Sequence, residues 1–233
     1  MSTKVKVATY VVVDRDGYLL SARGHIWLDT VETYWGSVLI VVAGTPGTGK
    51  SLLGVNLSRM LKRKFTTISW IVLEKGLWLH YDAARRSFVI DDRAIIETLR
   101  KYTDYIVETH WLELFESIAD SIEGVVVTRC NPVILLERLK RRGWPARKIA
   151  ENVEAELTSV IAGEARALAE KGIPVVEIDT THGRPSSNAA LAIDMLRKGE
   201  SSCCIDWLTI LDEKKLEFLL ESLARLSSGV NTA

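Results

Sequence analysis

The sequence predicts an α/β fold, a doubly wound five-stranded parallel sheet with helices on both faces. One observation is the continuous apolar run Val38–Ala43, which is typical of a central parallel strand buried on both sides. The other is that short β-branched runs alternate with segments of helical apolar spacing over the following residues. The expected strands are residues 38–43, 67–73, 105–107, 125–128 and 175–178.

Between these strands, apolar residues recur at the three- and four-residue spacing of amphipathic helices. Asp91 and Asp92 are side chains that commonly cap a helix N-terminus, so one helix should begin beside them. The expected helices are residues 52–62, 92–101, 132–142, one long helix over about 146–171, 189–197 and 213–226.

The chain divides into three predicted parts: an extension at 1–37, an α/β domain at 38–200 and a helical extension at 201–233. In the first part, the β-branched run Val5–Val13 and the run Tyr18–Ala22 flank a turn signal at residues 14–17, which predicts a β-hairpin. An aromatic linker with Trp27, Tyr34 and Trp35 follows. In the last part, Trp207 precedes an amphipathic helix.

Composition indicates an ordinary soluble protein with no overall charge that would draw it to nucleic acid or membrane, so any such contact must come from a local patch. Of 233 residues, 47% are hydrophobic and 26% charged, and 30 basic residues balance 30 acidic ones. No run approaches the roughly 20 apolar residues of a membrane span, so we expect a cytoplasmic location. Cys130, Cys203 and Cys204 form neither a disulfide framework nor a four-ligand zinc site, and we expect reduced thiols.

The most specific motif is the glycine-rich stretch from Gly44 to Ser51, which matches the Walker A pattern GxxxxGK[ST] of P-loop proteins. It lies between a buried strand and the start of a helix, where backbone N–H groups can bind phosphates. Lys50 should reach the β- and γ-phosphates of ATP, and the Ser51 hydroxyl should bind Mg²⁺. The predicted ATP-binding residues are Gly44, Gly47, Thr48, Gly49, Lys50, Ser51 and Leu52.

A second group, Glu108 and His110, follows the predicted strand at 105–107. P-loop enzymes need a carboxylate at the end of a neighbouring strand to hold the Mg²⁺ shell, and Glu108 is placed for that role. His110 could orient a water molecule or a phosphate oxygen. The residues alone do not distinguish this from two surface side chains at a strand end.

A basic segment follows the predicted strand at 125–128 and is interrupted by Gly143, Trp144 and Pro145. Three interpretations are open: an arginine-bearing lid that closes over the nucleotide, a solvated helix face, and an RNA-contacting patch. Its basic residues are Arg129, Arg138, Lys140, Arg141, Arg142, Arg147 and Lys148.

With these motifs in order, the chain resembles the adenylate kinase isoenzyme 6 family, from about Val38 to the end. The Walker A sequence and the acidic-x-His pattern at 108–110 carry much of the resemblance. Further matching segments are residues 137–144, 151–157, 177–181 and 205–207.

The resemblance implies a nucleoside monophosphate kinase with an acceptor segment at about 67–90 and a short lid at about 141–151. It implies phosphate transfer from Mg·ATP to AMP or related monophosphates, with ATP hydrolysis. Arg142 would contact ATP and, helped by Arg138, would stabilise the transferring group, and His110 would position water or the acceptor. It also implies a role in late small-subunit (16S rRNA) maturation, with the ribosomal protein uS11 and pre-ribosomal RNA as partners.

The chain departs from the family pattern at Glu108, where Asp is usual, at Trp70, where an acidic residue is usual, and in the extension at 1–37. Two other functions therefore stay open from the sequence. One is an assembly ATPase with little kinase activity, and the other is a kinase for a non-nucleotide alcohol.

Overall fold

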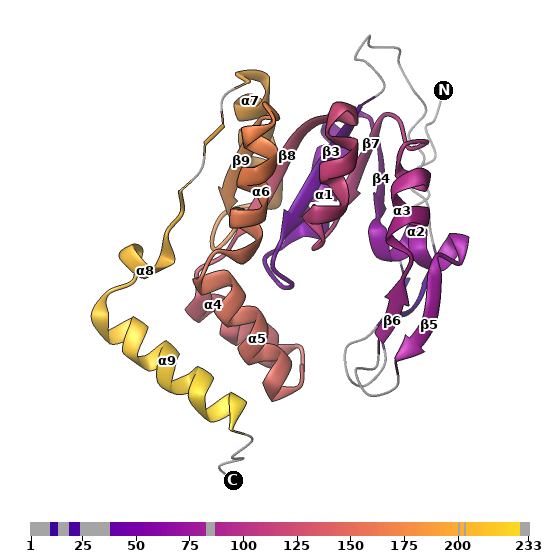
Figure 1. Cartoon of the computed structure of the whole chain (residues 1–233). Helices are drawn as coiled ribbons and strands as arrows, with labels where there is room; N and C mark the ends of the chain where they lie inside the picture. Colours follow the sequence, from indigo (N-terminus) through magenta and orange to yellow (C-terminus); the bar gives the residue numbers. More distant parts are fainter. Residues whose placement is uncertain are drawn as a thin grey trace, which may run out of the picture.

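The computed structural model describes residues 10–13, 19–23, 38–82, 87–199, 201–202 and 204–228. Its centre is a five-stranded sheet in which every neighbouring pair is parallel, in the order β4-β7-β3-β8-β9 (Figure 1). The predicted fold class is therefore confirmed. The strands are β3 (Leu39–Gly44), β4 (Lys64–Thr67), β7 (Tyr105–Glu108), β8 (Ile122–Arg129) and β9 (Val175–Asp179).

Helices cover both faces of this sheet because alternate residues of the central strand β3 point to opposite sides, and those from Leu39 to Ala43 are all apolar and buried. On one face, α1 (Lys50–Leu61) packs on β3 and α7 (Pro185–Arg197) packs on β9, with Leu53, Leu57 and Ala189 buried in one apolar cluster. The other face is covered by α2 (Ile68–Lys75), α3 (Asp92–Leu99), the 3₁₀ segment η1 (Leu112–Ser121) and α6 (Val160–Glu170). None of the helices in these described ranges is long and apolar enough to cross a membrane.

A separate apolar cluster joins the C-terminal segment to the rest of the protein. It is formed by α4 (Pro132–Arg141), α5 (Ala146–Leu157), α8 (Trp207–Ile210) and α9 (Glu213–Ser227). Trp207, Leu219 and Leu223 are buried there, and α9 lies alongside α5 (Figure 1). Upstream, Ser202 pairs with the outer edge of β9, donating its N–H to Val175 and accepting one from Glu177.

Near the N-terminus, β1 (Tyr10–Val13) and β2 (Leu19–Arg23) pair as antiparallel strands, as the hairpin prediction requires. The turn at 14–17, the linker residues Trp27, Tyr34 and Trp35, and Cys203 lie outside the described residues.

The predicted strand over 67–73 is wrong, because β4 ends at Thr67 and α2 begins at Ile68. The Thr67 side chain accepts the Trp70 N–H at 2.9 Å and caps the helix. A short apolar run of this length fits a buried helix as well as a strand. The sequence analysis also missed an antiparallel pair, β5 (Trp78–Asp82) and β6 (Ser87–Ile90), inside the expected acceptor segment.

The single helix predicted over 146–171 is two helices, α5 and α6, separated by Thr158 and Ser159. The Thr158 hydroxyl donates a hydrogen bond to the Glu154 carbonyl at 2.8 Å, and the backbone of Ser159 has a left-handed φ of 58°. The break places the Ser159 hydroxyl 2.8 Å from a guanidinium nitrogen of Arg129. By contrast, the predicted cap is confirmed, since the Asp91 carboxylate accepts the Ala94 N–H that begins α3.

Candidate active site

The Walker A residues form a tight loop between β3 and α1 at the carboxyl edge of the sheet. Two positions in this loop require glycine, because a side chain there would clash with neighbouring residues and because the backbone has positive φ. A Cβ atom on Gly44 would lie 2.3 Å from Thr128 Oγ1, and one on Gly47 would lie 2.7 Å from Leu135 Cδ1. Both residues also have positive φ, which L side chains rarely adopt. A side chain at either position would therefore clash with β8 or α4 and disturb the loop.

Lys50 begins α1, and its buried ammonium lies under this loop. Nζ donates to the carbonyl oxygens of Gly44 at 2.8 Å and Thr45 at 3.2 Å. Burial lowers the pKa of Lys50, while the negative charges of Glu108 and Glu156 oppose that shift and Arg142 adds to it. Glu108 and Arg142 are therefore within electrostatic range of the ammonium, as an ATP site requires.

Ser51 and Glu108 lie together beside this lysine. Strands β3 and β7 are neighbours, with Val42 level with Glu108, and Ser51 Oγ donates to Glu108 Oε1 at 3.1 Å. The other carboxylate oxygen, Oε2, is buried and has no hydrogen-bond partner among the described residues. A hydroxyl beside a buried carboxylate with a free oxygen fits the oxygen ligands that Mg²⁺ prefers. These two side chains could hold Mg²⁺, which would neutralise charge on bound phosphates.

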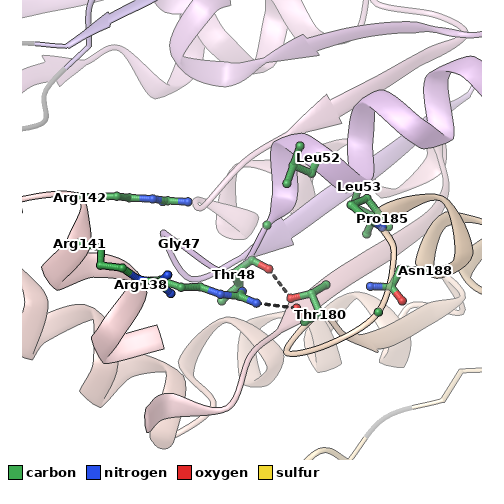
Figure 2. Close-up of a pocket in the computed structure, with 12 residues that line it drawn as sticks. Gly47, Thr48, Leu52, Leu53, Arg138, Arg141, Arg142, Thr180, Pro185 and Asn188 are labelled. Atoms are coloured by element: carbon green, nitrogen blue, oxygen red, sulfur yellow. Dashed lines mark hydrogen bonds between the residues drawn. The ribbon is translucent and has the colours of Figure 1, made fainter. Parts of the chain in front are cut away.

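A cavity of about 430 Å³ opens beside the loop, between α4 and the segment that follows β9. Figure 2 shows Arg138 and Arg142 extending from one side toward the loop, with Thr180 and Asn188 on the other. Arg138 donates to the Thr180 carbonyl at 2.9 Å, and the Thr180 hydroxyl donates to the Thr48 carbonyl. The cavity is lined by Gly47, Thr48, Gly49, Leu52, Leu53, Arg138, Arg141, Arg142, Thr180, Gly183, Pro185 and Asn188.

Comparison with known proteins decides the family. An AAA domain model matches residues 40–159. A Saccharolobus islandicus protein named "Putative adenylate kinase" is 36% identical over 196 residues, covering 82% of this chain and 97% of that protein. A protein of the same name from Archaeoglobus fulgidus is 33% identical, covering 78% of this chain and 98% of that protein. Another from Natronomonas pharaonis is 39% identical, covering 69% of this chain and 90% of that protein. This chain belongs to that archaeal adenylate kinase family.

Solved structures similar to this member of the adenylate kinase family include two small-molecule kinases. Shikimate kinase from Acinetobacter baumannii has 15% identity and a TM-score of 0.47, covering 72% of this chain and 97% of that one. A gluconokinase from Sinorhizobium meliloti has 19% identity and a TM-score of 0.43, covering 70% of this chain and 93% of that one.

In this adenylate kinase homologue the basic residues of the segment at 129–148 do not form one patch. Arg129 is separate from the rest of this segment, because its side chain is buried and pairs with Glu156 and Glu177. Arg138, Arg141 and Arg142 line the cavity instead.

Several site residues were missed by the motif analysis. Thr45 donates its hydroxyl to Glu156 Oε2 at 2.6 Å, and Thr128 Oγ1 lies 2.6 Å from Thr48 Oγ1. Glu156 stands in a helix with ordinary amphipathic spacing, so nothing local marks its burial. Thr180 and Gly183, in the loop that follows β9, also line the cavity.

His110 gives a prediction about pH. Burial, followed by the positive charges of Lys50 and Lys148, lowers its pKa from 6.5 to about 4, so the imidazole is neutral at neutral pH. The unfolded chain takes up this proton as the pH falls below 6.5, whereas the folded chain does so only near pH 4. The free energy of unfolding should therefore fall across that range, and less steeply in His110→Gln.

Urea unfolding at neutral pH and at pH 4 measures this difference. The matched control is His182→Gln, a replacement at an exposed histidine outside the phosphate-binding loop. Equal losses of stability in the wild type and in His110→Gln would contradict the prediction.

Proposed function

We propose that this protein is a nucleoside monophosphate kinase, which transfers the γ-phosphate of Mg·ATP to AMP or a related monophosphate. The observation that carries the proposal is the convergence of Lys50, the Ser51–Glu108 pair and two cavity arginines at one edge of the sheet. The names of the archaeal relatives support the same activity and the same acceptor.

In this proposal the protein acts by alignment and electrostatics, without a covalent intermediate. The loop amides from Gly44 to Leu52 bind the donor phosphates. Contacts with the Gly44 and Thr45 carbonyls hold the charge of Lys50 in place before ATP binds. When ATP binds, Lys50 exchanges these contacts for phosphate oxygens. Ser51 and Glu108 would hold Mg²⁺, in part through water.

Arg142 and Arg138 have different parts in the same scheme. Arg138 is tied to the carbonyls of Thr180 and Thr181, which fixes one wall of the cavity. Arg142 follows the last residue of α4 and precedes Gly143, which has a left-handed φ of 69°. We infer that Arg142 moves with the short lid at about 141–151 and neutralises charge on the transferring phosphoryl group.

His110 contributes a neutral hydrogen-bonding group in this scheme, because its pKa of about 4 leaves no positive charge at neutral pH. It therefore orients the acceptor or a water molecule rather than neutralising phosphate. The acceptor would bind over residues 67–90, where the β5–β6 pair exposes the rings of Trp78, Tyr81 and Phe88.

The test is a coupled assay of ADP formation by the purified protein with Mg·ATP, first alone and then with AMP, CMP or dAMP. Rapid ADP formation only with a monophosphate is the expected result. The assembly role implied by the family resemblance gives a different pattern, slow hydrolysis that rises only when uS11 is added. Activity unaffected by monophosphates and by uS11 would instead favour a non-nucleotide acceptor and contradict the proposal.

A further inference from the structure

A buried carboxylate on α5, Glu156, connects the phosphate-binding loop with the C-terminal segment. Its side chain is 2% exposed. Oε2 accepts the Thr45 hydroxyl at 2.6 Å. Oε1 accepts Arg129 Nε at 2.9 Å, the Cys130 N–H at 3.0 Å and Trp207 Nε1 at 3.0 Å. One carboxylate thus joins the loop, the end of β8 and the start of α8.

The loop side of this connection runs through Thr45, which organises the turn. Its carbonyl accepts Lys50 Nζ at 3.2 Å, the Thr48 N–H at 3.2 Å and the Thr48 hydroxyl at 2.8 Å. Fixing the Thr45 hydroxyl therefore fixes the peptide groups that face bound phosphates. Glu156 is not among the residues that line the cavity, so its direct contact with the loop is the Thr45 hydroxyl, beside the effect of its charge on Lys50.

The C-terminal side runs through residues 204–207. Arg129 donates to the Ile205 carbonyl at 2.9 Å. Glu177 accepts the N–H groups of Cys204 at 3.0 Å and Ile205 at 3.3 Å. Trp207 is 3% exposed and starts the segment that packs on α4 and α5. Removing this segment would take away some of the donors of two buried carboxylates, Glu156 and Glu177, which is costly.

We propose that Glu156 is a positioning residue for the phosphate-binding loop and that Trp207 holds Glu156 in place. Nucleotide binding and docking of the C-terminal segment are then thermodynamically coupled, and each strengthens the other. This inference rests on the proposed function only in requiring that the loop bind nucleotide phosphates.

The test uses the full chain and titrates Mg·ADP, with no acceptor, by calorimetry. Thr45→Val removes the hydroxyl, and Trp207→Phe removes the indole N–H but keeps an aromatic ring. Each should weaken ADP binding by about tenfold, the effect of losing a hydrogen bond to a charged group. Because both act through one carboxylate, the double variant should bind only slightly more weakly than either single variant.

Three controls separate positioning from general damage to the fold. Thr45→Ser restores the hydroxyl and should restore affinity. Ser159→Ala removes a different hydrogen bond of Arg129, outside the path to the loop, and should leave ADP affinity unchanged. In the wild type, ADP should also slow amide hydrogen exchange at residues 205–211, and this protection should be lost in Thr45→Val.

Wild-type ADP affinity in Trp207→Phe, or strictly additive losses in the double variant, would overturn the coupling. Because ADP binding is measured without an acceptor, failure of the coupling and failure of AMP phosphorylation are distinguishable.

Discussion

Lys50→Met is expected to lower phosphate transfer by at least about 10²-fold, the usual cost of removing one charge-stabilising donor from a transition state. The ammonium is buried, lies 2.8 Å from the Gly44 carbonyl and is within electrostatic range of Glu108 and Arg142. Methionine keeps the length and the apolar stem but supplies no charge for the phosphates. Steady-state ADP formation with Mg·ATP and AMP measures the change.

Lys214→Met is the matched control, since it makes the same replacement at an exposed position of α9 far along the chain from the loop. Its turnover should equal that of the wild type, and both variants should keep the wild-type circular dichroism spectrum. Near-normal transfer by Lys50→Met would remove the loop from the proposed mechanism.

Arg129→Leu is expected to lower the free energy of unfolding by about 3–5 kcal/mol, the typical cost of breaking a buried ion pair from one side. The guanidinium pairs with Glu156 and Glu177, and all three side chains are almost completely buried. Leucine fills part of the volume but leaves two buried carboxylates without their cation. Urea unfolding followed by circular dichroism measures the loss.

The comparison variant is Arg147→Leu, because Arg147 pairs with Glu151 where both side chains are exposed to solvent. Exposed ion pairs contribute little to the free energy of unfolding, so the urea midpoint of Arg147→Leu should be close to that of the wild type. If Arg129→Leu were as stable as Arg147→Leu, the buried network described above would be wrong.

The parts of the fold that the sequence predicted are those set by local patterns. The strand expected at 38–43 is present as the buried parallel strand β3 (Leu39–Gly44), and the glycine-rich motif continues from it, because strand, loop and helix start are contiguous in the chain. The segment at 67–73 was misassigned because a short apolar run fits either a strand or a buried helix, and the Thr67 cap decides for the helix.

The grouping of the candidate site residues was predicted where a motif marks them, and it was missed where residues meet only through folding. Lys50, Ser51 and Glu108 are close together, as their spacing around two neighbouring strands implies. Arg129 and Glu156 resemble surface charges in the sequence, since burial depends on packing against the C-terminal segment. Charge alone therefore could not separate the cavity arginines from the structural one.

The most direct test of the central claim follows the phosphate itself, using ATP labelled in its γ-phosphate together with unlabelled AMP. The account predicts that the label appears in newly formed ADP, that this requires Mg²⁺, and that Lys50→Met abolishes it. Label released only as inorganic phosphate, with none in ADP, would contradict the claim that this protein is a nucleoside monophosphate kinase.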